Sequence, residues 1–134
     1  MKQFAQSLQN DLNKYFSAVR ITCIQTQEQL LNEIRAINPD KLPAVIIVFD
    51  DMLLNSQEGI KEYHFTLVVV SRFVAASSEK ALTAFSCVDT LLELFPTDGR
   101  MIDETFVHPT DCVAASPAEN YAAFALGITA KKGF

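Results

Sequence analysis

The segment 43–54 reads PAVIIVFDDMLL. Six consecutive apolar residues, Ala44 to Phe49, run directly into the adjacent pair Asp50 and Asp51. A strand that is apolar on both faces is typical of the middle of a sheet, so we expect a central strand here. Acid at a strand end is compatible with a metal or phosphoryl site. It is equally typical of a strand that reaches solvent through a turn. The second interpretation is favoured, because neighbouring residues of an extended segment point to opposite faces and do not easily share one metal ion.

Three helices are predicted around this strand. Helical spacing of apolar residues indicates a first helix over about 2–17 and a third over about 78–95, which Pro96 ends. A shorter helix within 26–37 begins with Thr26 and Gln29, the two positions of a capping box. We expect the apolar stripes of the two long helices to be buried together, through Phe4, Leu8, Leu12, Phe85, Val88 and Leu92. On this prediction, Leu8→Ala or Leu92→Ala costs about 2–5 kcal/mol of stability.

Further strands are predicted at 19–25, 62–72, 105–115 and 120–130, from β-branched runs and apolar alternation. The segment 51–60 has no clear period and is expected to be a loop. Strands do not alternate regularly with helices. The predicted fold class is therefore α+β: one domain over 1–134, with a mixed, mainly antiparallel sheet and two long helices packed on one face.

Composition excludes several classes of protein. The formal net charge of the 134 residues is -5, and Lys and Arg are scattered, so we expect no nucleic-acid specificity. No run approaches the roughly 20 apolar residues of a membrane span, and we expect neither a membrane segment nor a signal peptide. The three cysteines are far apart in sequence, which predicts reduced, buried thiols and no zinc site.

No catalytic constellation is predicted, and we expect no enzyme, cofactor or metal. His64 and His108 have no sequence neighbours that complete a triad. The run FDDMLLNSQEG, 49–59, resembles the phosphoacceptor strand end of response-regulator receivers. However, the first predicted strand of this chain ends in IQTQ, without the acids that would hold magnesium. A degenerate receiver-like signalling or adaptor domain, or a small enzyme built on Asp50 and Asp51, therefore stays as an alternative.

The order of the segments LPAVIIVFDD, EYHFTLVVVSR, SEKALTAFSCVDTLLELF and NYAAFALGITAK, after an amphipathic first helix, resembles the tail-terminator or tail-completion proteins of Mu-like phages and prophages. The resemblance covers about residues 4–130. It implies a structural subunit of the virion tail, made in the bacterial host cytoplasm. Such a subunit caps the tail tube and supports head–tail joining.

The resemblance also implies partners. They are other copies of the chain in a ring, which would be a hexamer to match six-fold tail tubes, together with the tail tube and head–tail connector proteins. A ring is made from head-to-tail contacts, which need two different patches on each subunit. We expect candidate interface residues in the apolar segment 51–60 and in the C-terminal tail, namely Met52, Leu53, Leu54, Lys131, Lys132 and Phe134.

Overall fold

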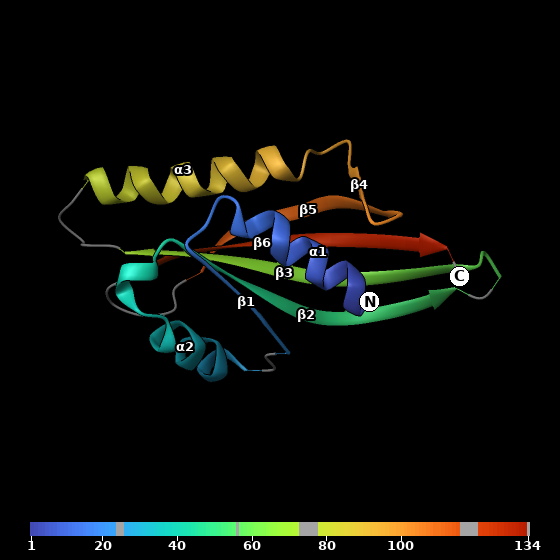
Figure 1. Ribbon diagram of the computed structural model, residues 1–134, viewed down its shortest axis with the longest axis horizontal. Coiled ribbons are helices and arrows are strands. Elements are labelled where there is room, and N and C mark those ends of the chain that lie inside the picture. Colours follow the sequence, from blue (N-terminus) through green and yellow to red (C-terminus); the bar gives the residue numbers. More distant parts are fainter. Residues whose placement is uncertain (24–25, 56, 73–77, 116–120, 134) are drawn as a thin grey trace.

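The computed structural model describes residues 1–23, 26–55, 57–72, 78–115 and 121–133. Three α-helices and a short 3-10 helix, η1, are combined with six strands (Figure 1). Along the chain the elements are α1 (Lys2–Asn13), β1 (Ala18–Thr22), α2 (Gln27–Ala36), η1 (Pro39–Lys41), β2 (Ala44–Asn55), β3 (Ile60–Arg72), α3 (Ser78–Leu94), β4 (Arg100–Ile102), β5 (Thr105–Ala115) and β6 (Tyr121–Gly133).

The strands form one mixed sheet in the order β1-β2-β3-β6-β5-β4. Only β1 and β2 pair in parallel, and the pairs β2–β3, β3–β6, β6–β5 and β5–β4 are antiparallel. The expected α+β fold with a mixed, mainly antiparallel sheet is therefore confirmed. The central strands are β3 and β6, which pair along their whole length, and β2 lies next to them.

Two clusters of buried residues occupy the two faces of the sheet. The larger cluster combines α1 and α3 residues with alternate strand residues such as Phe65 and Leu67. On the opposite face, Ile34 of α2 packs against Ile46 and Val68, together with Ile37 at the C-terminal end of the helix. The capping box of α2 is present as predicted, since Gln29 N–H donates to Thr26 Oγ1 over 3.2 Å. The expected packing of the two long helices together on one face is not confirmed.

Helix α1 lies where the sheet curls. It contacts both β1 and β4, the two opposite edge strands, so the sheet bends around it (Figure 1). Phe4, Leu8 and Leu12 are buried, as the periodicity predicts. Polar contacts join its other side to the β4 region, where the Arg100 guanidinium pairs with Asp11. The short β4–β5 turn also accepts a hydrogen bond from α1, from the Ser7 hydroxyl to the Asp103 carboxylate.

The predicted stripe of α3 is wrong by one residue. Phe85 and Leu92 are 52% and 42% exposed, and Val88 is only partly buried. The buried face of the helix consists instead of Ala84, Cys87 and Leu91, and Phe95 follows directly after the helix. The expected cost of Leu92→Ala assumed a fully buried side chain, and Leu92 does not meet that condition.

Several elements differ from the prediction. Strand β6 continues to Gly133 instead of ending near 130, so Lys131 and Lys132 belong to a strand and not to a C-terminal tail. Helix α1 ends at Asn13 instead of near 17. The segment 51–60 is not a loop, because β2 continues to Asn55 and β3 begins at Ile60. The strand β4 was not predicted. Its hairpin turn, Asp103–Glu104, has positive φ at both residues, which is the two-residue type I′ geometry usually encoded by Asn-Gly or Asp-Gly.

Candidate functional site at the projecting end of the sheet

The far ends of β2, β3 and β6 extend past the N-terminus of α1 (Figure 1). We refer to the ends of these three strands, residues 51–55, 60–64 and 129–133, as the projecting end. The β2–β3 hairpin that closes it is defined locally: the Glu58 N–H donates to Asn55 Oδ1 over 3.0 Å, and Gly59 has a φ of 64°. A positive φ suits glycine, which has no Cβ to clash with the backbone. The hairpin is thus encoded by the residues NSQEG.

A β-bulge at Asp50 separates the projecting end from the core. Phe49 pairs with Phe65 and Asp51 with His64, so Asp50 is the extra residue in β2. The Thr66 hydroxyl donates to the Asp50 carboxylate over 2.7 Å, and Asp51 contacts the His64 ring nitrogen Nδ1. Thr66 and His64 share one face of β3. Two expectations are therefore wrong: the aspartates do not end a strand, and the bulge places both carboxylates on the same face.

Polar and ionisable side chains continue across this face in a connected row. Asp51 pairs with His64 Nδ1, and Glu62 lies 3.2 Å from His64 Nε2. Glu62 in turn lies 3.5 Å from the Lys131 ammonium on β6. The row therefore links β2, β3 and β6 electrostatically. Since all four side chains are partly in contact with solvent, each pair contributes at most about 1 kcal/mol to stability.

The two histidines are not brought together. His64 and His108 both stand opposite Thr129 on β6, in the same cross-strand row but two strands apart. Two strand spacings amount to about 10 Å, beyond hydrogen-bond reach. Within the described part of the chain, the buried His108 Nδ1 has no hydrogen-bond partner. The two histidines therefore do not form one site together.

Two of the cysteines, Cys87 and Cys112, are not activated nucleophiles. Burial raises the pKa of the Cys87 thiol, and burial together with the neighbouring Asp111 carboxylate raises the pKa of Cys112. A raised pKa keeps a thiol protonated at neutral pH, where the thiolate would be the nucleophile. All three cysteines are free in the structure, but Cys23 and Cys112 are exposed, so the expectation of buried thiols holds for Cys87 alone.

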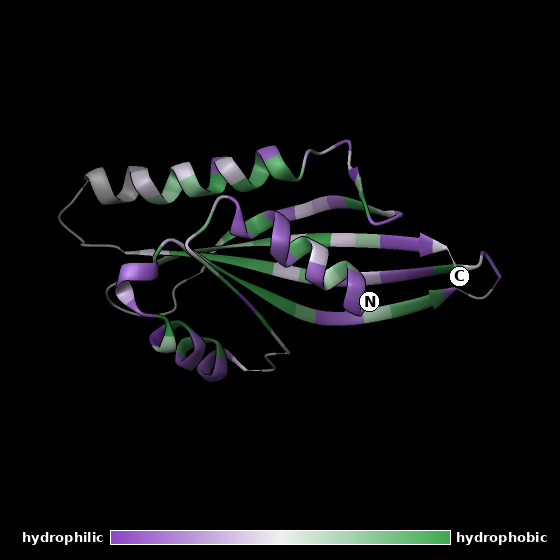
Figure 2. Ribbon diagram, in the orientation of Figure 1, coloured by the Kyte–Doolittle hydropathy of each residue, from purple (hydrophilic) through white to green (hydrophobic). Residues whose placement is uncertain are grey.

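Apolar side chains are exposed on β2 beyond the bulge. Met52, Leu53 and Leu54 are 42%, 54% and 64% exposed. Figure 2 shows the corresponding pattern along β2, a hydrophobic inner half, a hydrophilic band and a hydrophobic far end. Strand β1 pairs with β2 as far as Val48, and no strand among the described residues pairs with the outer edge of 49–55. An apolar, unpaired edge of this kind is a site for association with another chain.

The predicted interface residues lie on both faces of the projecting end. A shallow cavity of about 560 Å³ is lined by Leu53, Leu54 and Lys131, with hairpin residues between them. Lys132 pairs in register with Lys61 and lies on the other face of the sheet from Lys131. The structure thus brings five of the six candidates to one end of the molecule. The sixth, Phe134, lies outside the described residues.

Within residues 1–23, 26–55, 57–72, 78–115 and 121–133, no group of three or more His, Cys, Asp or Glu side chains is arranged to hold a metal ion. None of the described helices combines the length and the apolar character needed to span a bilayer. Comparison with known protein-family models and with curated proteins gives no match to this chain.

Proposed function

We propose that this chain is a structural assembly subunit that associates with copies of itself through the projecting end of its sheet. The observation that carries the proposal is the exposure of three consecutive large apolar residues, Met52 to Leu54, on a well-formed strand. Soluble monomers usually protect such an edge with lysine, proline or a covering element. Here the bulge and the two aspartates protect only the inner part of the β2 edge.

The specific role proposed is that of a phage or prophage tail terminator, or tail-completion subunit. In that role the chain forms a ring, a hexamer, on the end of the tail tube and presents a surface to head–tail connector proteins. The resemblance in segment order supports the phage assignment, and the exposed apolar edge supports association. A further support is that the two strand faces of the projecting end differ in charge, with the Asp51–Glu62 row on one and Lys132 on the other. Unlike faces suit head-to-tail contacts.

The receiver-like alternative has less support. Receivers place their phosphoacceptor at the carboxyl end of a strand in a parallel sheet. In this chain Asp50 lies within a strand that continues to Asn55, and β2 pairs in antiparallel fashion with β3. The carboxylates of Asp50 and Asp51 are occupied by Thr66 and His64. These contacts suit a polar link between β2 and β3 better than a phosphorylation site.

The experiment is sedimentation velocity over a wide range of protein concentrations, repeated with purified tail tubes. The wild-type chain is expected to self-associate or to bind tube ends, and Leu54→Asp is expected to reduce both. Met101→Asp on β4 is the matched control, because Met101 is 61% exposed against 64% for Leu54 but lies at the other edge of the sheet. A wild-type chain that stays monomeric and does not bind tube ends would contradict the proposed function.

A further inference from the structure

The outer face of α3 is a second exposed apolar surface, far from the projecting end. Phe85, Val88 and Leu92 are spaced as one helical stripe. Phe85 and Leu92 are about half exposed, and Val88 between them is partly buried and packs against the core. Phe85 leans on the Phe124 ring of β6, with the ring centroids 6.0 Å apart. The stripe is therefore supported from below by the sheet, while its outer side faces solvent. An ordered apolar stripe of this kind is typical of a surface that another protein covers.

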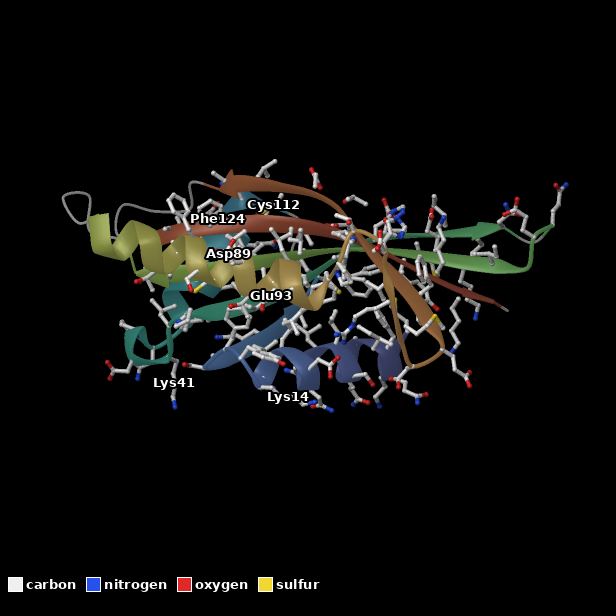
Figure 3. The ribbon with its side chains drawn as sticks, turned by 90° about the horizontal axis from the view of Figure 1, so that it is seen from above. Lys14, Lys41, Asp89, Glu93, Cys112 and Phe124 are labelled. Atoms are coloured by element: carbon white, nitrogen blue, oxygen red, sulfur yellow. The ribbon has the colours of Figure 1, made fainter. Side chains whose placement is uncertain are left out.

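The stripe is accompanied by acidic side chains. Asp89 and Glu93 are both exposed and lie four residues apart, hence on the same side of the helix. Figure 3 shows Asp89 and Glu93 along α3, with Phe124 on the neighbouring strand. We call the set Phe85, Val88, Asp89, Leu92 and Glu93 the helix patch. It combines an apolar stripe with two negative charges.

One face of the projecting end has the opposite charge. Leu54, Lys61 and Lys132 stand in one cross-strand row, and Met52 lies in the next row on the same face. We call these four residues the tip patch. It combines two exposed apolar side chains with two lysines. The tip patch and the helix patch therefore match in kind, with apolar groups to meet apolar groups and the Lys132 ammonium to meet carboxylates.

We infer that the helix patch is the docking surface for the tip patch of a second copy of this chain. The inference rests on the proposed function and adds the identity of the two contacting surfaces. Within one chain the patches lie apart, since α3 runs along one side of the sheet and the tip is at its far end (Figure 1). The contact is thus head-to-tail, and repeating it builds a ring or an open chain. Two helix patches facing each other would instead oppose Asp89 and Glu93 with the same carboxylates, which is repulsive.

The test uses two full-length variants, each defective in one patch. Leu54→Asp disables the tip patch, and Leu92→Asp disables the helix patch. Each variant alone is expected to sediment as a monomer. An equimolar mixture is expected to form a dimer and nothing larger, because each chain retains one functional patch. Met101→Asp is again the control, and circular dichroism with thermal melting checks that every variant is folded.

Charge reversal gives a second, independent measurement. Lys132→Glu and Glu93→Lys are each expected to weaken association by about tenfold or more, because each places like charges in contact. Both changes in one chain are expected to restore much of the lost affinity. The measurement is repeated with tube ends present, so that it applies to whichever assembly forms.

The outcomes separate the inference from the proposed function. If Leu92→Asp and Glu93→Lys assemble like the wild-type chain while Leu54→Asp does not, the helix patch is not the docking surface and the assembly function stands. The same conclusion follows if the equimolar mixture gives no dimer. If an unrelated protein, and not a second copy, is retained through the helix patch, the inference is also wrong. A wild-type chain that neither associates nor binds tube ends overturns both the inference and the proposed function.

Discussion

Helices α1 and α3 follow the same sequence rule with different results. Both show apolar residues at helical spacing, and both stripes were expected to be buried. In α1 the stripe Phe4, Leu8 and Leu12 is in the core. In α3 the corresponding residues Phe85 and Leu92 face solvent, and the buried positions lie one residue earlier, at Ala84 and Leu91.

The difference arises from the residues that lie outside the predicted stripe in each helix. The remaining positions of α1 are mostly Gln, Asn, Asp and Lys, so only one face can be buried. Helix α3 has two adjacent apolar stripes, offset by one residue, and periodicity cannot choose between them. The tertiary structure makes the choice: Ala84, Cys87 and Leu91 face the sheet, and Phe85 and Leu92 do not. A helix with a second apolar stripe left outside is a candidate for partner binding.

The largest effect is expected in α1. Leu8 is fully buried, so Leu8→Ala should lower the free energy of unfolding by about 2–5 kcal/mol, through lost burial and the cavity left behind. Urea denaturation measures the change, and Gln6→Ala on the exposed side of the same helix is the control. A cost below about half a kcal/mol would show that the α1 stripe does not form part of the core.

The next comparison lies within α3 and uses the same substitution at neighbouring positions. Leu91→Ala should cost about 2–5 kcal/mol, because Leu91 is only 1% exposed. Leu92→Ala should cost less than about 1 kcal/mol when the protein is dilute and monomeric. Thermal or urea unfolding of the pair reports the orientation of the helix directly. Equal costs, or a larger cost at Leu92, would contradict the orientation described above.

A smaller effect is expected at the polar contact between α1 and β4. Arg100 pairs with Asp11 and both side chains are 31% exposed, so Arg100→Gln should cost about 0.5–1 kcal/mol. A double-mutant cycle with Asp11→Asn isolates the pair, and added salt should reduce its coupling energy. Arg20→Gln, at a more exposed pair with Glu33, is the control. The absence of any coupling would mean that α1 is held by its apolar face alone.

Thiol labelling leaves the fold intact and distinguishes the inner face of α3 from the surface. At mildly alkaline pH, iodoacetamide should modify the exposed Cys23 first and Cys112 more slowly, because burial and Asp111 raise the pKa of Cys112. Cys87 should react last, since it is buried and burial raises its pKa. Peptide mass spectrometry gives the order. Rapid labelling of Cys87 in the native protein would mean that this face of α3 is accessible.

The raised pKa of Cys87 also predicts the direction in which stability changes with pH. Its folded-state pKa is raised above the unfolded value, so the folded state favours the neutral thiol. The stabilising contribution is fully present below the unfolded pKa, about 8.5, and is lost as pH rises through the folded pKa. Stability of the wild-type chain should therefore fall at alkaline pH more than that of Cys87→Ala. Parallel pH dependences would show that Cys87 ionises equally easily in both states.

Much of the fold could be predicted where a local signal is unambiguous. The capping box of α2, the apolar inner half of β2 and the two final strands are all encoded by short-range patterns. The far half of β2 was missed because Asp50 interrupts the alternation as a bulge, which the chain accommodates only when β3 is paired beside it. The strand β4 was missed because Asp103–Glu104 is an unusual pair for a type I′ turn.

The candidate interface was likewise predicted in part from the sequence and decided in part by the tertiary structure. Met52, Leu53, Leu54, Lys131 and Lys132 were expected as interface residues of the ring that the resemblance implies, and the structure places them together at one end of the sheet. Tertiary structure alone decided three further features. They are the position of the Asp50 and Asp51 carboxylates on one face, the separation of His64 from His108 and the outward stripe of α3. The physical reason is that periodicity specifies which residues share a face of an isolated element. Which face is then buried depends on the volume and pairing offered by neighbours distant in sequence.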